Sequence, residues 1–146
     1  MNNKRDVYFE LLIKMLKIFD NNNFFIPDAG SQNRQNLSCP DNQENFNMII
    51  NRRGHINKDK LTYIMNSNSI GNLIRLDMTG PSHIGFDDKD IPTPHIHIFD
   101  EEHNFGNIVV PLSELSNDTI TEVFDSVAFF LWYNKVQMSD LEIPMV

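Results

Sequence analysis

The sequence of 146 residues has a single cysteine, few basic residues and no long apolar run, and each shortage excludes a class of protein. Cys39 alone cannot build an intramolecular disulfide framework or a multi-cysteine zinc module, and it fits a reducing compartment. No apolar run approaches the roughly 18 residues that a membrane-spanning helix requires. We therefore expect a cytoplasmic protein without a membrane partner.

Basic residues are scarce, and the scarcity is concentrated in the second part of the chain. The 12 Lys and Arg residues face 20 Asp and Glu residues, which gives a formal net charge of -8. Residues 1–60 carry nine basic and seven acidic residues, whereas residues 61–146 carry three and thirteen. Because coating a nucleic acid requires clustered Lys and Arg, we do not expect direct nucleic-acid binding. The acidic part either keeps the protein soluble or attracts a basic protein partner.

The apolar residues, including 11 Phe, are sufficient for one hydrophobic core. The length then predicts that residues 1–146 form a single domain. One segment does not fit a regular element: residues 27–45 are polar, rich in Asn and Gln, and contain Pro27, Gly30 and Pro40. This composition predicts a long mobile loop.

Two stretches have the apolar spacing of an amphipathic helix, residues 6–19 and residues 119–135. Before the second, Ser116, Asn117 and Asp118 are candidate N-cap residues, and a Thr-x-x-Glu capping box follows at 119–122. Between the helices, alternating apolar residues predict strands at 46–53, 60–66, 73–78, 95–99 and 107–110. We therefore predict an α+β fold, in which the N-terminal and C-terminal helices pack on an antiparallel sheet of about five strands.

The strand at 95–99 carries the residues with the clearest chemical potential. His95 and His97 alternate with two isoleucines, which places both imidazoles on one face of the strand. If this strand pairs with residues 73–78, the same face gathers Arg75 and Asp77. His83, in the intervening loop, could fold back over that face.

Three interpretations of this group remain open. Asp77, His83, His95 and His97 could bind a divalent transition metal such as zinc. Alternatively, Arg75 could bind a phosphate while His95 or His97 acts as a general acid or base, as in a phosphodiesterase or nuclease. The third interpretation is a group without a ligand, either an ordinary polar sheet face or one in which hydrogen bonds of His83 or Asp77 hold the Pro-rich loop in place.

Acidic residues surround the histidine strand in the sequence. A field of this sign repels phosphate and attracts a cation or a basic protein surface. It therefore disfavours the phosphate interpretation unless a metal offsets the charge. The candidate partner-binding residues are Asp87, Asp88, Asp90, Asp100, Glu101 and Glu102.

The segment LIRLDMTGPSHIGFDDKDIPTPHIHIFD resembles an uncharacterised family of small bacterial and phage-borne proteins, whose pattern joins an LRLD-like strand end, a Gly-Pro-x-His motif and a Pro-His-x-His strand. Where that family has an Asp-Gly turn, this chain has the sequence FDDK. The resemblance implies a bacterial or phage setting, among mobile-element genes whose small acidic products often inhibit another protein. The matching residues are Arg75, Leu76, Asp77, Gly80, Pro81, His83, Pro94, His95 and His97.

Two functions follow as hypotheses. The first is an acidic protein that binds and modulates a basic, nucleic-acid-handling protein, in the manner of an antitoxin or an anti-CRISPR protein. The second is a metal- or histidine-dependent phosphodiesterase or nuclease that uses Asp77, His83, His95 and His97.

Overall fold

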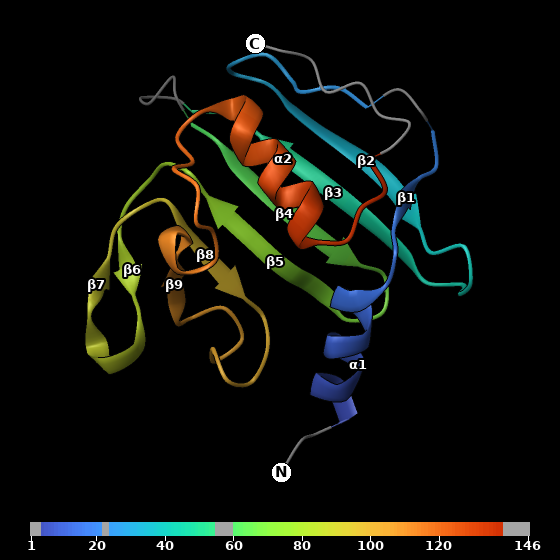
Figure 1. The fold of residues 1–146 in the computed structure, drawn as a ribbon, viewed down its shortest axis with the longest axis horizontal. Helices are drawn as coiled ribbons and strands as arrows, with labels where there is room; N and C mark the ends of the chain where they lie inside the picture. Colours follow the sequence, from blue (N-terminus) through green and yellow to red (C-terminus); the bar gives the residue numbers. More distant parts are fainter. Residues whose placement is uncertain (1–3, 22–23, 55–59, 139–146) are drawn as a thin grey trace.

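An antiparallel sheet of seven strands is the centre of the structure, a computed structural model that describes residues 4–21, 24–54 and 60–138 (Figure 1). Its strand order is β1-β2-β3-β4-β5-β8-β9, and each strand pairs antiparallel with its neighbours. The strands are β1 (Ile18–Phe19), β2 (Gln32–Ser38), β3 (Asn45–Asn51), β4 (Thr62–Ser67), β5 (Gly71–Asp77), β8 (His95–Ile98) and β9 (Val109–Pro111).

Two helices, a small hairpin and two 3-10 turns complete the described residues. They are α1 (Lys4–Lys14), α2 (Val123–Tyr133), the hairpin strands β6 (His83–Ile84) and β7 (Asp90–Ile91), and the turns η1 (Phe86–Asp88) and η2 (Leu112–Glu114). The α+β class and the antiparallel arrangement are therefore confirmed. Among the described residues, no helix is long and apolar enough to span a membrane.

The expected number of about five strands is too low, because the sheet also contains β1, from the expected helix, and β2, and a separate hairpin of β6 and β7 lies before β8. Segment 27–45 includes β2, which pairs with β3 from Gln32–Asn51 to Ser38–Asn45. Its side chains are polar on both faces, so the apolar alternation that marks a strand is missing. Segment 79–94 contains the β6–β7 hairpin, which buries too few side chains to produce a sequence signal.

Both helices are shorter than expected. Helix α1 ends at Lys14, and the apolar residues at 18–19 belong to β1 instead. Helix α2 begins at Val123 because Glu122 is the N-cap and shares a capping box with Asp125, rather than the box expected at 119–122.

The two faces of the sheet have different environments. Helix α2 lies across one face (Figure 1), where the Tyr63 hydroxyl lies 2.8 Å from Ser126 Oγ and the Tyr63 ring stacks on Phe130. Side chains alternate along a strand, so the neighbours of Tyr63 point away from α2. We call the face opposite α2, along β2 to β5, the open face. Its exposed or half-buried side chains are Gln32, Arg34, Asn36, Ser38, Asn45, Asn47, Ile49, Asn51, Ile64, Asn66, Asn72 and Arg75.

Lys17 joins the ends of the two helices from inside the core. Its side chain is fully buried, and Nζ donates to the carbonyl oxygens of Leu12 at 2.9 Å and Asn134 at 2.7 Å, near the C-termini of α1 and α2. It also lies over the ring of Phe46, 4.9 Å from the centroid. Burial lowers the pKa of Lys17 to about 8, and the surrounding carbonyl oxygens compensate for the lost water.

Replacing Lys17 with Met should lower the free energy of unfolding by about 1–3 kcal/mol, because the helix-end carbonyls lose a buried donor. Urea denaturation monitored by circular dichroism measures the change. Lys14→Met is the matched control, since Lys14 is exposed and its ion pair of 3.6 Å is with Glu10 on the same helix. Equal stability of the two variants would show that Lys17 does not tie the helices together.

Candidate metal centre

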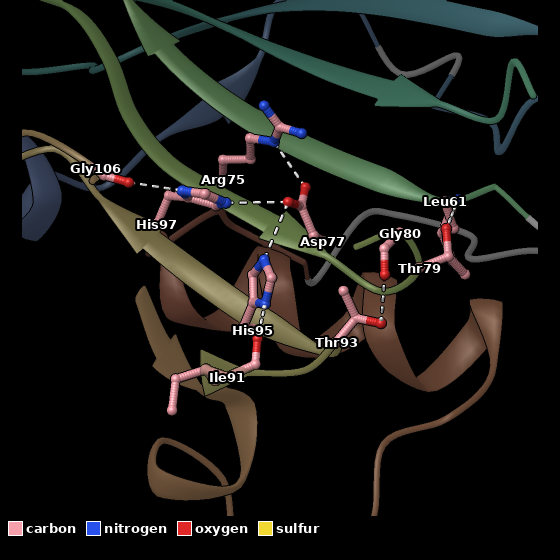
Figure 2. A network of polar contacts seen from close by, with 10 residues as sticks. All are labelled: Leu61, Arg75, Asp77, Thr79, Gly80, Ile91, Thr93, His95, His97 and Gly106. Atoms are coloured by element: carbon pink, nitrogen blue, oxygen red, sulfur yellow. Dashed lines mark hydrogen bonds and ion pairs between the residues drawn. The ribbon is translucent and has the colours of Figure 1, made fainter. Parts of the chain in front are cut away.

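The register of β5 and β8 brings the candidate residues together on the side of the sheet away from α2. Arg75 pairs with His97 and Asp77 pairs with His95, so the four side chains stand next to one another on two adjacent strands (Figure 2). His95 and Asp77 are buried, His97 is almost fully buried, and Arg75 is half-buried. The strand alternation in the sequence is sufficient to place them on one face.

The carboxylate of Asp77 is the centre of this group. Its Oδ1 accepts a hydrogen bond of 2.7 Å from Arg75 Nε. Its Oδ2 lies 3.3 Å from Nε2 of His95 and 3.0 Å from Nε2 of His97. Two imidazoles therefore point the same ring nitrogen at one carboxylate oxygen (Figure 2).

The other ring nitrogen of each imidazole is held by a backbone carbonyl. His95 Nδ1 lies 3.2 Å from the oxygen of Ile91, and His97 Nδ1 lies 2.7 Å from the oxygen of Gly106. A carbonyl oxygen can only accept, so each Nδ1 carries the proton. In a neutral imidazole, Nε2 then has a lone pair, which a carboxylate oxygen repels. Either a second proton or a metal cation must therefore stand between each Nε2 and Asp77.

His83 completes the group from outside the large sheet. It lies on β6, is exposed, and its ring meets those of His95 and His97 nearly edge-on, with centroids 5.2 and 5.0 Å away. The ligand atoms of Asp77, His83, His95 and His97 all lie within 4.8 Å of one another. The structure thus brings together the four residues singled out as metal ligands.

The hairpin that carries His83 fits closely against the sheet. A Cβ atom on Gly85 would lie 2.6 Å from Ile91 Cγ1 and 3.1 Å from the carbonyl oxygen of Val109 in β9. Only glycine permits this approach of the hairpin to the sheet edge. This role of Gly85 cannot be predicted from the sequence, because a single glycine has many uses.

The electrostatics favour the anionic form of Asp77 and the neutral form of His83. Burial by itself would raise the pKa of Asp77, but hydrogen bonds from His95, His97 and Arg75 hold it well below its usual range. Partial burial and the neighbouring imidazoles of His97 and His95 lower the pKa of His83, which favours its neutral form. Asp77 can therefore act as an anionic oxygen ligand and His83 as a neutral nitrogen ligand.

Three imidazoles and one carboxylate form a donor set typical of zinc and also compatible with iron. In such sites, the ligating histidines usually donate their second ring N–H to a carbonyl or carboxylate, which fixes the ring orientation. Ile91 and Gly106 supply carbonyls of this kind. Sequence analysis missed both, because a backbone carbonyl carries no residue-type signal.

The acidic candidates lie in two segments, the β6–β7 hairpin with Asp87, Asp88 and Asp90, and the turn of residues 100–102 after β8. The Phe86 ring contacts the ring of His103, with centroids 5.4 Å apart, which brings these acidic segments together. His103 itself is buried, and its Nδ1 lies 2.6 Å from Asp100 Oδ1.

Comparison with known proteins identifies the family but not its activity. The model of a family of unknown function, DUF6978, matches residues 5–136, so the chain belongs to that family. No curated protein and no solved structure matches the sequence. The family match supports the expectation of an uncharacterised family.

The carbonyl that orients His97 belongs to a glycine that can be tested directly. Gly106 has φ +89°, and an added Cβ would lie 2.6 Å from Phe99 Cε1. Gly30 has the same φ, with no atom near the position of a Cβ. We expect Gly106→Ala to lose about 1–3 kcal/mol more unfolding free energy than Gly30→Ala, since only Gly106→Ala adds a steric clash.

Thermal or urea unfolding of the two variants measures this difference. Nitrogen-15 spectra of the imidazoles then show whether His97 Nδ1 has lost its acceptor in the Gly106→Ala protein. If both variants lose the same stability, the contact with Phe99 does not constrain the loop.

Proposed function

We propose that this protein is a metal-dependent hydrolase with a single divalent transition metal ion of the zinc type, bound by Asp77, His83, His95 and His97. One observation carries the proposal: two buried imidazoles have their Nδ1 protons on backbone carbonyls and direct Nε2 at the same carboxylate oxygen. This is the orientation that metal ligands require.

The exposure of the site supports a catalytic role for the ion in addition to a structural one. Three ligands come from the rigid pair β5–β8, whereas the fourth, His83, comes from an exposed hairpin, which leaves one side of the site near solvent. A zinc ion held by these four residues would take a water as a fifth ligand and lower its pKa to about 7. For a phosphodiester, the oxygen of this water would attack phosphorus and lose its proton, the P–O bond to the leaving alcohol would break, and the leaving oxygen would take up that proton.

Zinc binding tests the ligand set directly. The protein should bind one equivalent of zinc, and His95→Ala or His97→Ala should weaken binding at least about 100-fold, because each removes a buried ligand. Equilibrium dialysis with elemental analysis measures both values. Cys39→Ala is the control and should bind like the wild type, since Cys39 is a buried thiol that belongs to neither group of possible metal ligands among the described residues. Wild-type protein without stoichiometric metal, or a Cys39 variant that alone loses it, would contradict the proposal.

The hydrolytic part has its own test. Zinc-loaded protein should cleave a chromogenic phosphodiester, whereas the His97→Ala variant should not, after circular dichroism has verified its fold. Metal binding without any metal-dependent cleavage would leave the ion with a structural role, and the hydrolase assignment would be wrong.

A second candidate function is binding to a basic protein that handles nucleic acid. The contact of Phe86 with His103 favours it, because this contact joins the acidic segments of the hairpin and the 100–102 turn into one surface. Asp87, Asp88, Glu101 and Glu102 are exposed there. Their charge could direct a basic partner to the rim of the metal centre.

Neutralising this rim tests the second function. Asp87→Asn, Asp88→Asn, Glu101→Gln and Glu102→Gln should together abolish retention of a basic protein at physiological salt. Asn tolerates the positive φ of the two hairpin positions. The control carries Glu114→Gln and Asp118→Asn, two exposed acids elsewhere, and should retain the partner. Equal retention by both variants would exclude the acidic rim as the binding surface.

A further inference from the structure

A straight row of side chains crosses the open face and ends at the metal centre. The strand registers pair Arg34 with Ile49, Ile49 with Ile64, Ile64 with Arg75, and Arg75 with His97. All five belong to the same face, because directly paired residues point to the same side of a sheet. Neighbouring strands lie about 4.8 Å apart, so the backbones at Arg34 and Arg75 are about 14 Å apart.

The charges on this face differ from those of the molecule as a whole. The side chains of β2 to β5 on the open face include Arg34 and Arg75, and their only acidic member is the buried Asp77. Asp20 stands at the far edge, where it accepts a hydrogen bond of 2.8 Å from Ser38. The acidic segments belong to the β8–β9 side of the metal centre. An anion can therefore approach along the open face.

Both arginines have donors available for such an anion. Among the described residues, Arg34 is exposed and has no hydrogen-bond or ion-pair partner. Arg75 uses Nε to hold Asp77, and its side chain is 38% exposed, so the terminal nitrogens of the guanidinium remain for a ligand near the metal. A guanidinium is well suited to phosphate oxygens.

Two polar side-chain atoms on β3 and β4, the strands between the two arginines, also lack hydrogen-bond partners among the described residues. Thr62 Oγ1 and Asn47 Oδ1 on this face are buried and form no hydrogen bond within the described part of the chain. Thr62 lies directly beside Asp77 in the sheet register. The half-buried Ile49 and Ile64 provide an apolar surface between the charges.

We infer that the open face binds a single-stranded nucleic acid, with one phosphate on Arg75 beside the metal and another on Arg34 at the far end of the row. The inference rests on the proposed hydrolase function and names its substrate. A free phosphate could contact Arg75 and the metal, but it is too short to reach Arg34. Single-stranded nucleic acid combines regularly spaced phosphates with bases that can rest on apolar side chains and bond to carboxamides.

Fluorescence anisotropy with a labelled oligothymidylate and zinc-loaded protein tests this inference. Arg34→Gln and Arg75→Gln should each weaken binding by about 3- to 10-fold and reduce the salt dependence by about one phosphate contact. Lys135→Gln removes the same charge next to Trp132 at the end of α2, away from the open face, and should bind like the wild type. Zinc content is measured for every variant.

The result for the Arg34→Gln variant is decisive, because Arg34 lies three strands away from the metal ligands. If Arg34→Gln and Lys135→Gln bind the oligonucleotide equally, the open face is not the binding surface. If inorganic phosphate displaces the probe and only Arg75→Gln weakens phosphate binding, the ligand is a small phosphate and the inference is overturned. A failure to bind zinc would refute the proposed function instead, and elemental analysis detects it separately.

Discussion

Two imidazoles share one oxygen of the Asp77 carboxylate, and both have already committed their Nδ1 protons to backbone carbonyls. The lone pairs that remain on Nε2 cannot face a carboxylate oxygen without a positive charge between them. Several neighbouring segments hold these imidazoles in place or add a further ligand. The segment before β8 supplies the carbonyl of Ile91, the turn after β8 supplies that of Gly106, and the hairpin adds His83. The need for a proton or a metal cation between Asp77 and the two imidazoles links the fold to the proposed chemistry.

The layering of the fold determines where this chemistry can occur. Helix α2 packs over Tyr63 on one face, so the face with the histidines keeps its polar side chains. Adjacent strands of a sheet hold side chains more rigidly than loops, which suits a ligand set that must keep its geometry. Lys17 secures the ends of α1 and α2 to each other.

The sequence contained enough to predict the α+β class and the common face of Arg75, Asp77, His95 and His97, because both depend on simple periodicity. It did not reveal β2, whose polar side chains lack an apolar alternation and whose pairing is decided by the neighbouring β3. Helix boundaries shifted because local capping by Glu122 and the strand pairing of residues 18–19 outweighed the helical spacing. The approach of His83 depended on a short hairpin and a close glycine contact, which spacing alone does not encode.

Net charge does not describe the surroundings of the metal centre, because its two sides carry different charges. The acidic hairpin and turn border one side of the metal centre, while Arg34 and Arg75 stand on the open face.

X-ray absorption spectroscopy of zinc-loaded protein tests most directly which atoms coordinate the ion in the metal centre. We expect three imidazole nitrogens, one carboxylate oxygen and one water oxygen at about 2.0–2.2 Å from the ion. A spectrum with one histidine or none in the coordination shell would contradict it.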